Sequence, residues 1–314
     1  MKYPISKEFF PYTHLTPPYI CPGFAKLCGD LMRPPRSLWR DSRVDVTCHK
    51  IKSYDQKEIT VLMIAPKGVK EVLPCMVYCH GGAFSYSASP AHYHNTIRYA
   101  TEVGMRIAFV QYRRAPKYRF PTPGEDCFAA YKWVAENADE LMIDPDRIAV
   151  GGDSAGGALA ALLSRLVAER VAKKPVFQLL IYPVLDMRCS TRSQLEFTDT
   201  PMWNSRLSRL MWQGYLGKAP DEGILSYASP SLIEDISCMP PSYIETAEFD
   251  CLRDEARDFA LRLMTAGVPT VLNETLTTLH GFDARTDAPK TLEVVATRIN
   301  YMKKMLYGEG DTEI

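Results

Sequence analysis

The chain has 314 residues, of which 46% are hydrophobic and 24% charged, a composition typical of a globular protein with a large buried core. Lys plus Arg and Asp plus Glu both number 37, so the formal net charge is zero. This balance gives no sign of the strongly basic surface that binds nucleic acids or anionic membranes, and it favours a small, fairly neutral ligand.

The first forty-odd residues are rich in proline, cysteine and aromatic residues and show no clear period. From about residue 60, short apolar runs alternate with segments of helical period. The expected strands are 60–64, 75–79, 106–111, 148–151, 177–181, 243–246 and 270–274, and the expected helices are about 92–103, 125–138, 155–170, 253–266 and 288–305. This order predicts an α/β fold with a mostly parallel central sheet that helices flank.

Residues 186–235 interrupt this alternation, because they contain no strand pattern and carry apolar residues at helical spacing. We therefore predict a single domain over residues 1–314, in which about 1–45 and 186–235 form a helical cap. The α/β core would comprise 46–185 and 236–314. An extra pair of helices without any role at the site would have the same sequence pattern.

The segment RIAVGGDSAGGALAALL, residues 147–163, has the pattern of a strand, a sharp turn and a helix, with Ser154 at the turn. Gly152 and Gly156 flank this serine, where a Cβ atom would hinder the close approach of neighbouring backbones. The helix that begins near Ala155 would also direct its free N–H groups toward the same point. Ser154 is therefore predicted to be a nucleophile that attacks a carbonyl group.

A second glycine motif, His80-Gly81-Gly82-Ala83-Phe84, follows the expected strand 75–79. Backbone N–H groups of such a turn can point into a pocket and stabilise a negatively charged oxygen. We expect the N–H groups of Gly81, Gly82 and Ala155 to form an oxyanion hole. The alternative is a tight turn that needs glycine only for its backbone conformation.

A nucleophilic serine needs a histidine base, and His280 lies in a loop after the last expected strand. The other five histidines lack a motif, belong to the glycine turn or form an H-x-H pair without further metal ligands: His14, His49, His80, His92 and His94. No metal and no cofactor is expected. Asp250 follows the strand 243–246 and is favoured over Asp254 and Asp283 as the acid that orients His280.

Five sequence blocks together resemble the hormone-sensitive-lipase-like esterases of the α/β-hydrolase superfamily, over about residues 60–305. They are HGGAF at 80–84, YRRAP at 112–116, GDSAGG at 152–157, DCLRD at 250–254 and HGF at 280–282. The resemblance implies a carboxylesterase that hydrolyses short to medium acyl esters with Ser154, Asp250 and His280, and it implies a homodimer. Ala83 and Arg114 depart from the residues usual in this family.

Two other functions remain compatible with these motifs. An amidase or peptidase would use the same three residues, and non-catalytic receptors on this fold resemble the family but lack the histidine that His280 provides. Five aromatic residues are candidates for the walls of the substrate pocket, although core packing would give the same pattern: Phe84, Tyr86, Trp203, Trp212 and Tyr215.

The expected location is the cytoplasm, without membrane association. The nine cysteines show no C-x-x-C pair, which favours free thiols in a reducing compartment. Residues 1–10 contain a proline and several charges where a signal peptide has a continuous apolar run. No apolar stretch approaches the roughly 18 residues of a transmembrane helix.

Overall fold

The computed structural model describes residues 2–15, 34–171, 174–217 and 222–308. Within them, eight strands form one sheet in the order β1-β2-β4-β3-β5-β6-β7-β8. Strands β1 and β2 run antiparallel to their neighbours, and the other six are parallel. The strands are β1 Val44–Lys52, β2 Glu58–Pro66, β3 Leu73–Cys79, β4 Arg106–Gln111, β5 Ile143–Asp153, β6 Gln178–Ile181, β7 Ser242–Phe249 and β8 Thr270–Leu279.

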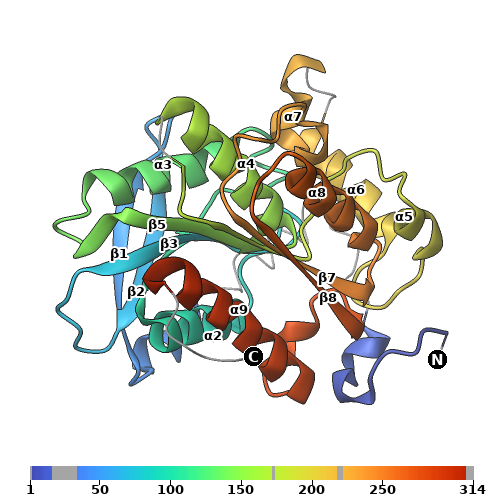
Figure 1. Cartoon of the computed structure of the whole chain (residues 1–314), viewed down its shortest axis with the longest axis horizontal. Coiled ribbons are helices and arrows are strands. Elements are labelled where there is room, and N and C mark those ends of the chain that lie inside the picture. The colour runs from blue at the N-terminus through green and yellow to red at the C-terminus, as the bar shows by residue number, and fades with distance from the viewer. Residues whose placement is uncertain (1, 16–33, 172–173, 218–221, 309–314) are drawn as a thin grey trace.

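Helices cover both faces of the sheet, as Figure 1 shows. Helices α3 (Thr122–Glu136), α4 (Ala155–Arg170) and α8 (Arg253–Thr265) lie on one face. Helices α2 (Pro90–Arg98) and α9 (Pro289–Tyr307) lie on the other, and a π-helical turn, Tyr99–Gly104, continues α2. The arrangement confirms the predicted α/β fold with a mostly parallel sheet.

Strand β1 (Val44–Lys52) was not among the expected strands. It pairs only with β2, at the edge of the sheet, and most of its side chains are exposed or half-buried. Its sequence, VDVTCHKIK, therefore alternates apolar with polar and charged residues and lacks the continuous apolar run of a strand buried on both faces. Positive charges of this kind are common on edge strands, because they discourage pairing with another chain.

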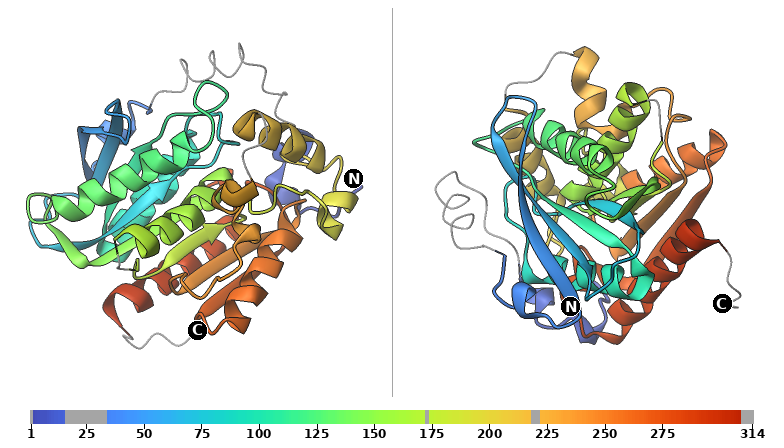
Figure 2. Two further views of the ribbon diagram at one scale, coloured as in Figure 1. Left: turned by 90° about the horizontal axis from the view of Figure 1, so that it is seen from above. Right: turned by 90° about the vertical axis from the view of Figure 1, so that its left-hand side faces the viewer.

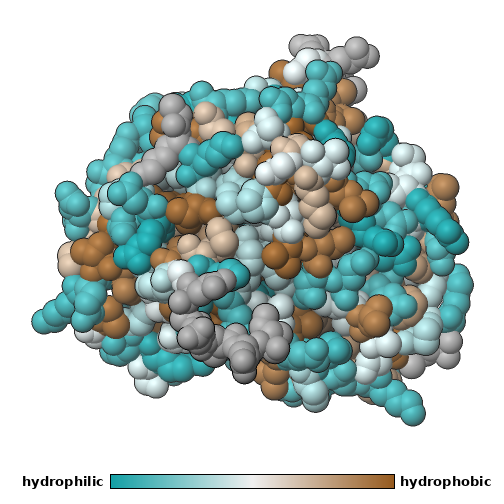
Figure 3. All heavy atoms as spheres, viewed as in Figure 1, coloured by the Kyte–Doolittle hydropathy of each residue, from teal (hydrophilic) through white to brown (hydrophobic). Residues whose placement is uncertain are grey.

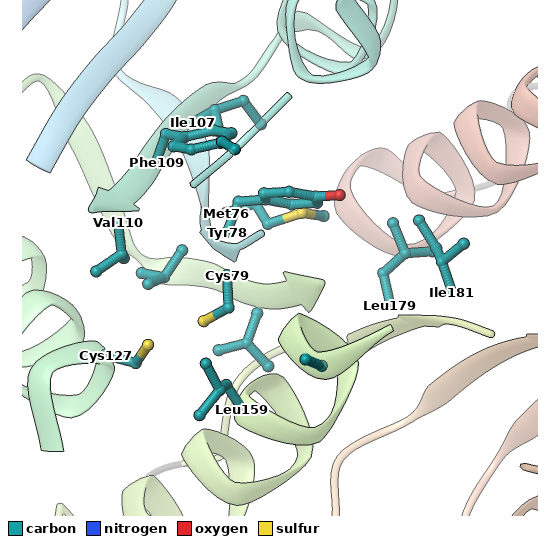
Figure 4. Packing of buried hydrophobic residues seen from close by; sticks show 14 of the residues in the cluster. Met76, Tyr78, Cys79, Ile107, Phe109, Val110, Cys127, Leu159, Leu179 and Ile181 are labelled. Carbon is teal, nitrogen blue, oxygen red and sulfur yellow. The ribbon is translucent and has the colours of Figure 1, made fainter. Parts of the chain in front are cut away.

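The core fills the space between the sheet and its helices, and Figure 4 shows part of it around β3. Alternate residues of a strand point to opposite faces, so Cys79 points toward Cys127 and Leu159 on the helices, whereas Tyr78 points to the other side. There the Tyr78 ring lies 5.6 Å from the ring of Phe109, measured between centroids. Strand β3, which precedes the turn at His80–Phe84 (the HGG turn), is thus held by packing on both faces.

Residues 186–235 form no strand within their described part. They contain three α-helices, α5 (Arg192–Glu196), α6 (Ser205–Leu216) and α7 (Leu225–Ala228), and two 3-10 turns, Glu222–Ile224 and Pro230–Leu232. Three further 3-10 turns, Lys7–Phe9, Tyr12–His14 and Leu38–Arg40, precede the sheet. The two irregular parts of the chain are therefore built from short helical elements.

The N-terminal segment packs against residues 186–235, and Figure 2 shows the blue segment beside the yellow helices. Lys2 Nζ lies 2.7 Å from an oxygen of Asp199, and the backbone N–H of Met202 donates to the carbonyl of Leu15. The same segment also touches the core, since Ser6 N–H donates to the carbonyl of Thr277. These contacts join the two irregular parts to each other and the N-terminal segment to β8.

Polar residues cover most of the face seen in Figure 3 and leave smaller apolar groups between them. No helix in the described ranges is long and apolar enough to cross a membrane. The seven cysteines of these ranges are all free thiols: Cys48, Cys75, Cys79, Cys127, Cys189, Cys238 and Cys251. Cys21 and Cys28 lie outside the described residues.

Candidate active site

Ser154 lies between β5 and α4 and has a positive φ of 54°, which a residue with a side chain adopts only under strain. Its two flanking glycines allow this turn to lie close to the end of β3. A Cβ atom on Gly152 would lie 2.5 Å from the carbonyl oxygen of Cys79, and one on Gly156 would lie 2.6 Å from the carbonyl carbon of His80. The expected need for glycine at both positions thus has a direct steric cause.

A Gly156→Ala variant is expected to lose about 2 kcal/mol or more of stability and about 100-fold or more in activity, because backbone atoms cannot move aside for the new Cβ. Gly214→Ala is the matched control. Gly214 lies within α6, where nothing is within 4 Å of an added Cβ, so alanine should keep the activity and slightly raise the melting temperature. Urea unfolding and ester hydrolysis measure both variants, and similar behaviour of the two would contradict this explanation.

The three predicted residues of the triad meet at the carboxyl ends of three parallel strands, two of which are separated by β6. Ser154, Asp250 and His280 directly follow β5, β7 and β8, respectively. His280 Nε2 lies 2.9 Å from Ser154 Oγ, and His280 Nδ1 lies 2.6 Å from Asp250 Oδ2. All three side chains are buried. The distances are those of two consecutive hydrogen bonds, the arrangement that lets a histidine remove a proton from a serine.

The two rival acids have other partners. Asp254 accepts from the backbone N–H of Ser193 at 2.8 Å, at the start of α8. Asp283 accepts from the Tyr182 hydroxyl and from Arg298 Nη1. Asp283 nonetheless contacts the site indirectly, through Tyr182. Tyr182 donates to Asp283, and its ring packs edge-on against His280 at a centroid distance of 4.8 Å.

The HGG turn follows β3 and is fixed in part by its own histidine. The His80 ring is buried between Tyr112 and Phe109, with its Nδ1 2.6 Å from the carbonyl of Gly81. Burial lowers the pKa of His80 to about 3, so this ring is neutral at physiological pH and donates from Nδ1. His80 therefore stabilises the turn to which it belongs.

The predicted set of oxyanion donors needs one correction. The N–H of Gly81 donates to Asp153 Oδ1 at 3.0 Å, so it is already engaged. The backbone N–H groups of Gly82, Ala83 and Ala155 form no hydrogen bond with another described residue. Gly82 and Ala83 line the cavity at Ser154, and Ala155 begins α4, where the first N–H groups have no acceptor within the helix. Ala83 thus takes the place of Gly81 among the candidate donors.

Asp153, the residue before Ser154, connects the serine turn with the HGG turn. Besides Gly81, it accepts from the Tyr78 hydroxyl at 2.8 Å and from His92 Nε2 at 3.0 Å. Burial alone would raise the pKa of Asp153, but its contact with His92 and the two other donors outweigh it and lower this pKa to about 2. Asp153 is therefore ionised at neutral pH and holds both turns in place.

His92 was considered at the sequence level only as half of an H-x-H pair. It lies in the first turn of α2, where the backbone N–H of Ser89 donates to its Nδ1 at 2.8 Å. Because Nδ1 accepts this bond, the ring carries its hydrogen on Nε2 and donates it to Asp153. In the described ranges, no group of three or more His, Cys, Asp or Glu residues could hold a metal ion.

Ser154 and His280 line a cavity of about 180 Å³. Of the five aromatic residues proposed for its walls, Tyr86 and Trp203 line it. The other three form a packed cluster beside it, in which the rings of Phe84 and Tyr215 are stacked 3.8 Å apart and Trp212 lies 6.0 Å from both. For Trp212 and Tyr215, helical spacing identifies an apolar face but not what covers it, and Phe84 follows the two glycines of the HGG turn but points into this cluster.

Most residues that line the cavity were missed by the sequence analysis. Besides those already named, they come from α2, the end of β6, the segment before α6 and the loop after His280: Ser89, Ala91, Asn95, Tyr182, Met202, Gly281, Asp283 and Ala284. Apart from Gly281 in the HGF block and Asp283, which was weighed as the acid, these residues belong to no motif and lie far apart in the sequence. Asp153 beside Ser154 and His92 after the HGG turn also gave a local signal.

Comparison with known proteins places this site in a family. Residues 76–284 match the family described as alpha/beta hydrolase fold. A carboxylesterase, NlhH of Mycobacterium tuberculosis, is 34% identical over 256 residues, which cover 80% of this chain and 79% of that protein. The solved structure of a bacterial heroin esterase has a TM-score of 0.84 and 32% identity, covering 98% of this chain and 99% of that one.

A thermostable esterase from Pseudomonas putida gives the same TM-score of 0.84 at 25% identity and covers 97% of this chain. The chain therefore belongs to the α/β-hydrolase family, in the branch of the hormone-sensitive-lipase-like esterases. It is an enzyme, a carboxylic ester hydrolase.

Proposed function

We propose that the protein is a serine carboxylesterase that hydrolyses esters of short to medium acyl chains through an acyl-enzyme on Ser154. The observation that carries this proposal is the pair of short contacts of His280, at 2.9 Å to Ser154 and 2.6 Å to Asp250. The curated relatives support it, since they include a carboxylesterase and an ethyl acetate hydrolase. Ethyl acetate has a short acyl group, which agrees with a cavity of about 180 Å³.

In the proposed mechanism, His280 Nε2 removes the proton of Ser154 as its Oγ attacks the ester carbonyl. Asp250 accepts a hydrogen bond from the Nδ1–H group of His280 and, without taking the proton, stabilises the imidazolium that forms. The N–H groups of Gly82, Ala83 and Ala155 stabilise the oxyanion of the tetrahedral intermediate, each by roughly 3 kcal/mol. His280 then protonates the leaving alkoxide, and water attacks the acyl-enzyme in a second cycle with His280 again as the base.

The N-terminal segment and residues 186–235 are proposed to form the cap of this site. Met202 and Trp203 belong to residues 186–235 and line the cavity. Leu15 accepts a backbone hydrogen bond from Met202, so the N-terminal segment supports the same wall. The cap would close the cavity over the acyl or alcohol group and limit its length.

Rapid quenching of the enzyme with p-nitrophenyl butyrate tests the proposal. We expect a burst of nitrophenol, and mass spectrometry should find one butyryl group on the peptide that contains Ser154. Hydrolysis without a burst could still proceed through an acyl-enzyme that breaks down quickly, so the enzyme is also treated with a phosphonate ester. Ester hydrolysis that survives the phosphonate, with Ser154 unlabelled, would overturn the proposed nucleophile.

The same butyryl group on p-nitroaniline distinguishes an esterase from an amidase. An anilide leaves less readily than a phenolate, so an enzyme selected for amides must protonate the leaving nitrogen well. We expect the ester to be hydrolysed and the anilide to remain nearly intact. Comparable kcat/KM values for the two substrates would favour the amidase alternative.

A further inference from the structure

Asn95 carries an unpaired polar atom at the wall of the active-site cavity. Its side chain is 95% buried, given an exposed fraction of 5%, and it lies on α2 beside Asp283. Asn95 Oδ1 is buried and has no hydrogen-bond partner among the described residues. No other described residue that lines this cavity has a buried side-chain nitrogen or oxygen without a hydrogen-bond partner. Buried polar atoms without a partner are rare in proteins, and many of them have a function.

The orientation of the Asn95 amide follows from its neighbour. Asn95 Nδ2 lies 3.4 Å from Asp283 Oδ2. An ionised carboxylate can only accept hydrogen bonds, so the nitrogen of the amide, and not its oxygen, must face Asp283. The oxygen is therefore the group that remains without a partner, and it can only accept a hydrogen bond.

The acids around Asn95 already have their donors. Asp283 receives the Tyr182 hydroxyl and Arg298 Nη1, in addition to Asn95. Asp153, which also lines the cavity, receives the three donors described above. The atom without a partner at this end of the cavity is thus a neutral acceptor, Asn95 Oδ1. A neutral donor such as a hydroxyl fits it better than an additional cation.

Resting on the proposed esterase function, we propose that the cavity takes esters with a hydroxyl group near the ester bond, and that Asn95 Oδ1 accepts a hydrogen bond from this hydroxyl. Asn95 and Ser154 line the same cavity of about 180 Å³, so a small ester bound at Ser154 occupies the space that Asn95 also lines. Asn95 is then a specificity-determining residue. The hydroxyl can belong to the acyl or to the alcohol part of the ester.

Two pairs of substrates separate these cases, because each pair exchanges a hydroxyl for a methyl group of similar size. The first pair is p-nitrophenyl 3-hydroxybutyrate and p-nitrophenyl 3-methylbutyrate, with the difference on the acyl part. The second pair is 2-hydroxyethyl butyrate and propyl butyrate, with the difference on the alcohol part. We expect the wild type to prefer the hydroxyl ester of one pair by about tenfold in kcat/KM.

The Asn95→Leu variant keeps the size of the side chain and removes the acceptor. We expect it to lose this preference to within about twofold while still hydrolysing the methyl ester, because apolar contacts to the methyl group remain. Asn273→Leu is the matched control, since Asn273 lies on β8, donates to Tyr243 and does not line the cavity. It should keep the preference of the wild type.

The outcomes separate this inference from the proposed function. If the wild type hydrolyses all four esters with the same ratios as Asn95→Leu, the inference is wrong and the esterase function stands. If the wild type hydrolyses none of them, the esterase function itself fails. Should Asn95→Leu not fold, as judged by its melting temperature, Asn95→Ala replaces it with the same expected loss of preference.

Discussion

Ser154→Ala is expected to reduce kcat for p-nitrophenyl butyrate by roughly 10⁵-fold, because His280 would have no hydroxyl from which to remove a proton. Some acceleration over water would remain, since the backbone donors of the site could still stabilise an oxyanion. The fold should be unaffected, because alanine can keep the same backbone conformation, with its φ of 54°, and only the hydroxyl that contacts His280 is removed. Steady-state kinetics and thermal unfolding measure the two effects.

Ser164→Ala is the control for this variant. Ser164 lies on the same helix, α4, and its hydroxyl is buried and donates to Ala160 and to Gln178. Its replacement should cost about 1 kcal/mol of stability and leave kcat unchanged, the opposite of the result for Ser154. Retention of more than about a hundredth of the wild-type kcat in Ser154→Ala would contradict the proposed nucleophile.

Arg298→Met is expected to lower the free energy of unfolding by about 4 kcal/mol, the largest stability effect that we predict. Arg298 is fully buried on α9 and donates to both oxygens of Glu245, at 3.0 and 2.5 Å, and to Asp283 at 2.7 Å. Methionine fills the same space without a charge. Two buried carboxylates then remain without a cation, which costs far more than the loss of an exposed ion pair.

The loss of stability in Arg298→Met should depend on pH, and the sign follows from Glu245. Burial raises the pKa of Glu245 above its usual value, and Arg298 opposes this rise. Without Arg298 the pKa rises further, so the folded variant binds a proton that its unfolded chain releases above about pH 4.3. The variant's loss in the free energy of unfolding, relative to the wild type, is therefore small at pH 5 and larger at pH 8. Urea unfolding at the two pH values would measure it.

Arg257→Met provides a matched control, because Arg257 pairs with Glu274 at 3.0 Å on the surface, where both side chains are over 40% exposed. Its loss should cost less than about 1 kcal/mol at either pH. A second variant, Glu245→Gln with Arg298→Met, should recover part of the stability by removing one unpaired charge. An equal deficit of Arg298→Met at pH 5 and pH 8 would show that lost packing, and not charge, explains it.

The parallel strands and the serine turn could be predicted from the sequence because their signals are local. The end of β5 and the start of α4 read GGDSAGG, in which Gly152 and Gly156 are required by contacts within the turn and with the end of β3. The positions of Asp250 and His280 followed in the same way, since each comes directly after a buried apolar strand. A parallel sheet brings such strand ends together whatever the details of its packing.

Contacts between distant segments could not be predicted in this way. The engagement of Gly81 by Asp153 depends on how closely β3 and β5 approach, and the role of His92 depends on the direction of α2. Nothing in the sequence near Asn95 distinguishes it from a surface asparagine. The edge strand β1 was missed for the related reason that its exposure to solvent removes the apolar run.

The stacking of Phe84 on Tyr215 has a mechanical consequence. Phe84 belongs to the HGG turn and Tyr215 to α6, and their rings are nearly parallel, with an interplanar angle of 7°. A swing of α6 large enough to separate the rings would also release the turn that carries Gly82 and Ala83. Helix α6 therefore stabilises this turn, and any opening of the cavity that keeps the N–H groups of Gly82 and Ala83 in place must leave α6 where it is.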